Sequence, residues 1–177
     1  MQILTNPFVW LCRFRHRRGY GIHSPFAFGF LMQVVYERHA FYAFPALDAG
    51  LAWWQRFRVR RTLHLLFRLA NYVHPQQIIA PDTSLAARYM QAARPQARSG
   101  SCRKMLSPTL VYLQAPWDED DTSILPLGAD DVLVLDSLHR HRAWFAALPA
   151  TVTFDLYDTG IAFFDPRFSR QHYIINF

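Results

Sequence analysis

LLFRLANYVHPQQIIAPDTSLAARYMQAA, residues Leu65–Ala93, is the stretch that decides the fold of this chain. Apolar residues recur at helical spacing up to Tyr72, and Gln77–Ala80 is a short apolar run that predicts a β-strand. A tight turn follows, and a second helix is expected to run to about Ala93. Helix, strand, turn and helix in this order are typical of the first unit of an α/β sheet that binds a nucleotide or cofactor.

Further apolar runs continue this pattern. They predict strands at Thr109–Gln114, Asp131–Asp136, Val152–Tyr157, Gly160–Phe164 and His172–Phe177. A short helix is expected at His139–Leu148, and residues 94–108 are expected to form a loop. The last three runs lie too close together for crossover helices, so we expect them to pair as antiparallel neighbours. A mostly parallel sheet that ends in an antiparallel hairpin points to the class I methyltransferase variant of the doubly wound fold. We therefore expect a shortened, Rossmann-like α/β domain.

The first 60 residues are expected to form a helical extension ahead of this domain, which spans residues 61–177. Ser24-Pro25 is a good helix start, because serine caps free N–H groups and proline fits the first turn. The helix that begins there is expected to run to Arg38. Asp48 is expected to cap a second long helix that continues to Tyr72.

Composition bounds the class of protein. The chain has 177 residues and a net charge of +6. Of its residues 51% are hydrophobic, and this fraction supports a packed core and argues against disorder. No apolar run reaches the ~18 residues needed to cross a bilayer, and the order of charges at the start does not fit a secretory signal. Cys12 and Cys102 are too few for a disulfide framework, so we expect a cytoplasmic protein without a membrane partner. Lys104 is the only lysine; arginine favours phosphate and carboxylate partners, but it also follows genome base composition.

Three stretches of the chain carry a resemblance to a known family. They are RHRRGYGIHSPFAFGFLMQVVYE (residues 15–37), LLFRLANYVHPQQII (residues 65–79) and the run from DVLVLDSLH to HYIINF (residues 131–177). Together they resemble class I S-adenosylmethionine-dependent methyltransferase-like proteins common in Bacteroidetes. The resemblance implies S-adenosylmethionine as cofactor and methyl transfer to an oxygen or nitrogen of an unknown acceptor, with the sulfonium supplying the reactivity.

A first departure from that family lies in the turn after the first strand. The family has roughly E-x-G-T-S-x-G there; aligned on Thr83-Ser84, this chain has Ala80 at the acidic position and Asp82 and Ala86 at the glycines. By resemblance, Asp82, Thr83 and Ser84 are the candidate cofactor-binding residues, and Asp82 or Thr83 is also expected to cap the next helix. Side chains in place of glycine obstruct the approach of a cofactor to the backbone, and Asp82 adds negative charge near its carboxylate.

A second departure is the short interval between Ala93 and Asp131. It holds 37 residues, whereas one βαβ unit takes about 30. The family fits its second, third and fourth strands here, and only Thr109–Gln114 is visible in this chain. If that run is the fourth strand, Gln114 replaces the expected acid. The acid that holds the ribose hydroxyls has no evident counterpart, and the sheet is expected to have lost an edge.

Asp136 and His139 follow the strongest strand, at the edge where α/β sheets bind ligands. In the related catechol-type methyltransferases an Asp-Asn pair at this place helps to hold a divalent cation. Asp136 is therefore a candidate metal or catalytic carboxylate, and His139 a candidate general base. The alternative is that Asp136 caps the following helix and His139 lies on its surface. The companion acid that a hard cation needs is not evident, so we expect no metal.

The N-terminal half holds features with two interpretations each. His23-Ser24-Pro25 fits a lid over the cofactor cleft or a plain helix start, and capping alone explains it. The basic cluster Arg13–Arg18, like the arginines between Arg56 and Arg61, fits a nucleic-acid site or a solvated surface, of which the second is the commoner. Trp53-Trp54 fits core or interface, and a homodimer closed through an uncovered apolar surface is one hypothesis.

Three functions remain open on the sequence. The first is a methyltransferase-like protein with a degenerate cofactor site and little or no activity. The second is a scaffold that binds partners through its arginine-rich N-terminus or an exposed sheet edge, and the third is an enzyme whose cleft a partner chain completes. The lost glycines, the short middle and Gln114 all affect one cofactor site, which favours the first.

Overall fold

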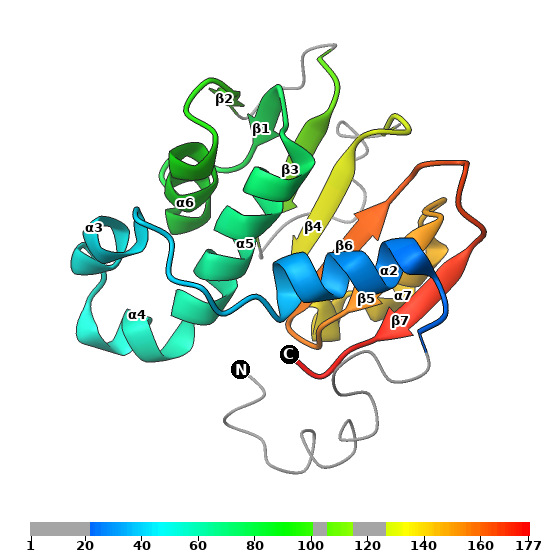
Figure 1. Ribbon diagram of the computed structural model, residues 1–177, viewed down its shortest axis with the longest axis horizontal. Helices are drawn as coiled ribbons and strands as arrows, with labels where there is room; N and C mark the ends of the chain where they lie inside the picture. Colours follow the sequence, from blue (N-terminus) through cyan, green and yellow to red (C-terminus); the bar gives the residue numbers. More distant parts are fainter. Residues whose placement is uncertain (1–21, 101–105, 115–126) are drawn as a thin grey trace.

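The protein folds as an α/β structure built on one sheet (Figure 1). The computed structural model describes residues 22–100, 106–114 and 127–177, in which seven strands lie in the order β2-β1-β3-β4-β6-β5-β7. Their bounds are β1 Gln77–Ile79, β2 Arg98–Gly100, β3 Thr109–Leu113, β4 Val132–Asp136, β5 Val152–Asp155, β6 Thr159–Phe163 and β7 Gln171–Ile174. Among them only β6 runs against the rest, so the sheet is mixed and mostly parallel. The predicted α/β class is confirmed, and the sheet is compatible with a Rossmann-like fold.

The last strand has a different neighbour from the expected one. β5 and β6 form the antiparallel hairpin, but β7 pairs in parallel with β5. β6 already lies between β4 and β5, so both of its edges are occupied and the free edge of β5 receives β7. The expectation that all three runs are antiparallel neighbours is therefore wrong for β7.

The predicted unit of helix, strand, turn and helix is present. Helix α5, Arg60–Val73, precedes β1, and helix α6, Leu85–Ala93, follows it. α5 buries a continuous apolar stretch and ends at His74, which adopts the left-handed conformation with φ of 56°. The two helices lie side by side on one face of the sheet (Figure 1).

A short strand lies in the stretch expected to be a loop. β2 pairs in parallel with β1, with Arg98 opposite Gln77. It lies at the edge of the sheet and its side chains are exposed or half-buried, so backbone pairing holds it without an apolar pattern. The described residues between Ala93 and Asp131 therefore contain two strands, and the expectation of one was wrong. The sheet keeps an edge strand beyond β1.

The described N-terminal part forms shorter helices than expected. They are α2 Pro25–Phe30, η3 Leu31–Val35, α3 Phe44–Ala49 and α4 Trp53–Arg58. Ser24 caps α2 as predicted, since its Oγ accepts a hydrogen bond from the Ala27 N–H at 3.3 Å. The second expected helix is divided into α3, α4 and α5, with breaks at Gly50 and Val59. Asp48 lies inside α3, so its expected role as a cap was wrong.

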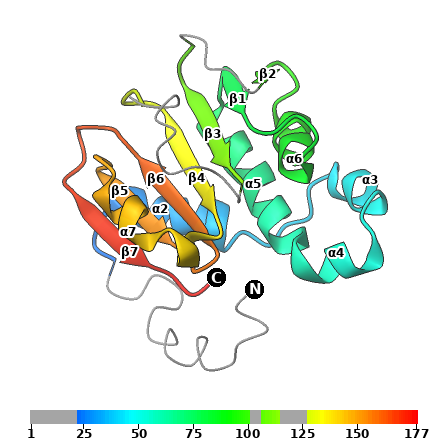
Figure 2. The same ribbon diagram turned by 180° about the vertical axis from the view of Figure 1, so that it is seen from behind.

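Two hydrophobic clusters hold the layers together. The larger lies between the sheet and the helices α2, α5 and α6 (Figure 1). The smaller lies on the other face, under helix α7, Arg142–Ala147, and the short turn η4, Leu138–Arg140 (Figure 2). The rings of Phe30 in α2 and Phe154 in β5 are 4.7 Å apart in the larger cluster. Helices on both sides of residue 60 thus share one core, and the domain boundary there stays a prediction.

Some predicted features lie outside the described residues. These are Cys12, Cys102, Lys104 and the basic cluster Arg13–Arg18. Within the described ranges, no helix is both long and apolar enough to cross a membrane.

Candidate functional site

A cavity of about 1030 Å³ opens at the carboxyl ends of β3 and β4, and we call it the strand-end cavity. Polar residues line it from these strand ends, from the turn before α6, from the turn between β5 and β6 and from α4 and α5. They are Thr83, Ser84, Tyr112, Gln114, Asp136, Ser137, Asp158, Arg58 and Thr62. Its apolar wall comes from Phe57 of α4, Leu63 and Leu66 of α5, and Leu85 and Ala86 of α6. Open α/β sheets bind ligands beyond the carboxyl ends of their strands. The cavity is therefore the candidate functional site.

The turn before α6 brings only some of the predicted residues to the cavity. Thr83 and Ser84 line it, whereas Asp82 is exposed and does not. Ser84 caps α6, because its Oγ accepts from the Ala87 N–H at 3.0 Å; the expected cap at Asp82 or Thr83 was wrong. Ala86 is 3% exposed and forms part of the wall. Of Asp82 and Ala86, Ala86 is thus the one that lines the cavity.

Asp136 ends β4 and lines the cavity as predicted. Burial raises the pKa of its carboxyl, and the charge of Asp158 raises it further, against a hydrogen bond from the Ser137 N–H. The N-cap position of η4 is held by Ser137, in the left-handed conformation with φ of 56°, and not by Asp136. A half-buried carboxyl with a raised pKa is suited to holding or moving a proton.

His139 lies behind the cavity wall rather than in it. Its Nδ1 is 3.2 Å from Oδ1 of Asp158, and its ring stacks on Tyr157 with centroids 5.8 Å apart. The imidazole is 26% exposed, so it is not the plain surface side chain of the alternative interpretation. His139 therefore lies beside Asp158, and its role as a general base stays a prediction.

Asp158 is the cavity residue that sequence reasoning missed. It lies in the turn of the β5–β6 hairpin, which the sequence marked only as a break between strands. The antiparallel pairing of β4 with β6 sets Asp136 opposite Thr159, and this register brings Asp158 to the cavity. The sequence pattern therefore gave no sign of Asp158, because only the pairing of β6 with β4 places it at the cavity.

The wall is richer in carboxylates than in cations. The described residues of the wall include two carboxylates, Asp136 and Asp158, and one basic side chain, Arg58. Such a wall favours hydroxyl-bearing or cationic groups of a ligand. The described residues hold no group of three histidine, cysteine or carboxylate side chains that could bind a metal ion.

A second cavity, of about 980 Å³, lies on the other side of α4, and we call it the arginine cavity. Its charged wall consists of Glu37, Arg38, His39, Asp48, Arg56, Arg60, Arg61, His64 and Arg68. Phe57 of α4 lines both cavities. The sequence indicated Arg56, Arg60 and Arg61 only as part of an ambiguous basic helix, and it did not single out Arg38 or Arg68.

Asp48 organises one end of the arginine cavity. Its carboxylate accepts hydrogen bonds from Arg60 Nε at 2.8 Å, His64 Nε2 at 2.9 Å and the Tyr89 hydroxyl at 2.6 Å. Burial raises the pKa of Asp48, but the bonds from Tyr89 and His64 outweigh it, so the pKa lies below its usual value. The His64 ring also stacks on Phe44 with centroids 3.7 Å apart.

Comparisons with known proteins add no relative. The chain matches no protein-family model, and neither a curated protein nor a solved structure matches it significantly.

Proposed function

We propose that this chain is a methyltransferase-like protein of Rossmann-like fold that has lost the usual mode of S-adenosylmethionine binding and has little or no methyl-transfer activity. The observation that carries the proposal is the strand-end cavity, bounded by the capped start of α6 and by Asp136 at the end of β4. A sheet with one reversed strand, β6, between β4 and β5 supports the same fold type, which the resemblance implied.

The residues at the cavity do not fit the family's usual hold on the cofactor. β2 has the sequence Arg98-Ser99-Gly100, which offers no carboxylate to the ribose hydroxyls. The carboxylates on the wall, Asp136 and Asp158, come instead from β4 and from the β5–β6 turn. The Ala86 methyl occupies space that glycine leaves free in the family. These differences support loss of the cofactor rather than a change of acceptor.

Calorimetric titration of the full chain with S-adenosylmethionine and with S-adenosylhomocysteine tests this proposal. We expect no binding tighter than about 1 mM, which corresponds to about −4 kcal/mol. Micromolar binding of either compound would contradict the proposal and favour an active enzyme.

Glycine restoration tests which part of the site was lost. Because Ala86 lines the cavity and Asp82 does not, we expect Ala86→Gly to raise affinity for S-adenosylmethionine more than Asp82→Gly does. Glycine near the start of α6 costs up to about 1 kcal/mol of helix stability, so unfolding is measured alongside. An equal gain in both variants would show that the cavity wall is not what excludes the cofactor.

An interaction role is the second candidate, and exposed aromatic side chains favour it. Tyr42, Trp53 and Phe57 are 88%, 76% and 77% exposed, and helix α4 buries none of its residues. Trp53 and Trp54 therefore lie outside the core, and exposed apolar surface of this kind marks association sites. We infer that the chain forms a homodimer through α4. Among interaction roles, this one is tested most directly.

Analytical ultracentrifugation at micromolar concentration tests the dimer. Trp53→Glu is expected to shift a dimer to a monomer, and Tyr42→Glu measures how far the surface extends. A clean monomer of the unmodified chain would contradict the homodimer.

A further inference from the structure

The arginine cavity holds more positive charge than its own carboxylates neutralise. Five arginines from the described chain line it, Arg38, Arg56, Arg60, Arg61 and Arg68, against the two carboxylates Glu37 and Asp48. Three positive charges are left over. His64 adds no charge near neutral pH, because burial lowers its pKa below the usual value.

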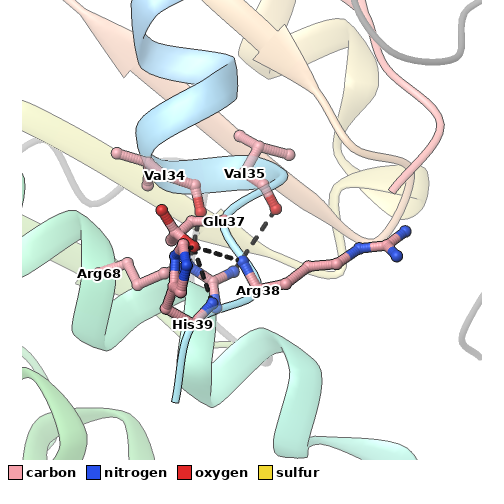
Figure 3. Close-up of polar contacts among 6 residues, drawn as sticks. All are labelled: Val34, Val35, Glu37, Arg38, His39 and Arg68. Carbon is pink, nitrogen blue, oxygen red and sulfur yellow. Dashed lines mark hydrogen bonds and ion pairs between the residues drawn. The ribbon is translucent and has the colours of Figure 1, made fainter. Parts of the chain in front are cut away.

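Each of the two carboxylates already accepts hydrogen bonds from its own neighbours. Asp48 accepts from Arg60, His64 and Tyr89. Glu37 accepts from the backbone N–H groups of Arg38 and His39 and contacts the His39 ring (Figure 3). Arg60 is the arginine of this wall that Asp48 pairs, while Arg61 lies over the Phe177 ring at 4.2 Å.

Arg68 forms the buried part of the wall. It is 8% exposed; its Nε donates to the Val34 carbonyl at 2.6 Å and its Nη2 to the Val35 carbonyl at 3.5 Å (Figure 3). Burial lowers the pKa of Arg68 to about 10; the charge of Glu37 opposes this shift, and that of Arg61 adds to it. The guanidinium therefore stays charged at neutral pH and repels Arg61.

Arg38 also repels Arg61. Its side chain points away from Arg68 in Figure 3. Desolvation lowers the pKa of Arg61, Tyr36 opposes this shift, and the charge of Arg38 adds to it. Like charges thus lie near one another along the wall, an arrangement that a bound anion relieves.

We propose that the arginine cavity binds a phosphate-bearing ligand. Guanidinium groups recognise phosphate through paired N–H donors, and a multiply charged phosphate matches the three charges left over. The volume of about 980 Å³ admits a ligand larger than the phosphate itself. Phe44 and Phe57 provide an apolar wall for the remainder of such a molecule.

Helix α4 offers a matched pair of variants to test this site. Arg56 lines the arginine cavity, whereas Arg58, two residues later, lines the strand-end cavity. Calorimetric titration with inorganic pyrophosphate is expected to show binding to the unmodified chain at low salt. Arg56→Gln and Arg61→Gln are each expected to weaken it about tenfold, and Arg58→Gln less than about twofold. Absence of pyrophosphate binding, or equal loss in Arg58→Gln, overturns the proposal.

His64 provides a second readout inside the cavity. Burial lowers its pKa first, Asp48 opposes that shift, and the charges of Arg60 and Arg68 lower it further. A bound anion offsets those charges, so pyrophosphate is expected to raise the pKa of His64 measured by NMR. An unchanged pKa at saturating pyrophosphate places the anion elsewhere and overturns the proposal.

Vesicle sedimentation identifies the source of the phosphate. Binding to phosphatidylglycerol vesicles that Arg56→Gln weakens and pyrophosphate displaces supports the site and assigns a lipid headgroup. Pyrophosphate binding without vesicle binding supports the site and assigns a soluble ligand. Vesicle binding without pyrophosphate binding overturns the proposal, because a charged surface alone then suffices.

Discussion

The two cavities beside α4 each contain an aspartate, and the pKa values of these two carboxyls are shifted in opposite directions. Asp48 in the arginine cavity has three donors and a pKa below its usual value. Asp136 in the strand-end cavity is desolvated beside Asp158 and has a raised pKa. A satisfied carboxylate stabilises the structure around it, whereas a desolvated one is held by the fold at a cost. Asp48 is thus a structural part of the arginine cavity. The carboxyl of Asp136 is instead available to a ligand in the strand-end cavity.

Arg68→Met is expected to have the largest effect on this comparison. It removes the buried donors to the Val34 and Val35 carbonyls and so opens one wall of the arginine cavity. We expect a loss of about 2–4 kcal/mol in the free energy of unfolding. Urea denaturation measures it, with Arg58→Gln as the exposed control. A loss below about 0.5 kcal/mol would show that the wall does not depend on Arg68.

Gly160→Ala tests the packing of the smaller cluster on the other face of the sheet. An added Cβ would lie 2.8 Å from Phe145 Cε2 and 3.2 Å from Leu138 Cδ1, inside the smaller cluster. We expect a loss of about 1–3 kcal/mol, since a buried ring has little room to move. Gly100→Ala is the control, because nothing lies within 4 Å of its added Cβ. Equal stability of both variants would contradict the tight packing of Gly160 against this cluster.

Asp48→Asn measures how much the satisfied carboxylate contributes. The pKa of Asp48 is lower in the folded state than the ordinary value of 3.8, so its contribution is full at neutral pH. It is lost as the pH falls through the folded pKa. We expect a loss of about 1–2 kcal/mol at neutral pH, shrinking in acid. Urea unfolding at both pH values tests this, and a pH-independent loss would contradict the ionic origin.

Asp136→Asn is expected to have the smallest effect, and in the opposite direction. Its folded pKa is raised above the ordinary value of 3.8, so the cost to the folded state begins as the pH rises above that ordinary value and is complete above the folded pKa. We expect a gain of up to about 1 kcal/mol at neutral pH that vanishes in acid. Thermal unfolding against pH measures it. Destabilisation at neutral pH would mean that Asp136 is a structural acceptor like Asp48.

Local patterns predicted the centre of the fold. The apolar spacing of α5, the run of β1 and the helix after Ser84 were each legible because burial imposes a period on the side chains. β2 was not legible, because an edge strand needs only backbone pairing. The division of the second long helix was also missed. The helical pattern of the sequence continues on both sides of Gly50 and Val59, where the structure has its breaks.

The candidate site was legible in part for a related reason. Asp136 and the turn at Thr83-Ser84 follow strands, and strand ends converge at one edge of a parallel sheet. Asp82 was expected there as well, but the turn leaves it exposed outside the wall. Asp158 reaches the cavity through the antiparallel register of β6, which no local pattern encodes.

The sequence by itself determined the α/β class, the unit around β1 and the position of Asp136, because each depends on residues close together in the chain. The tertiary structure decided the place of β7, the role of Asp158 and the arginine cavity. In each of these, the partners are distant in sequence, and packing alone selects them. Arg38 and Arg68 are thirty residues apart, yet the fold sets them around one cavity.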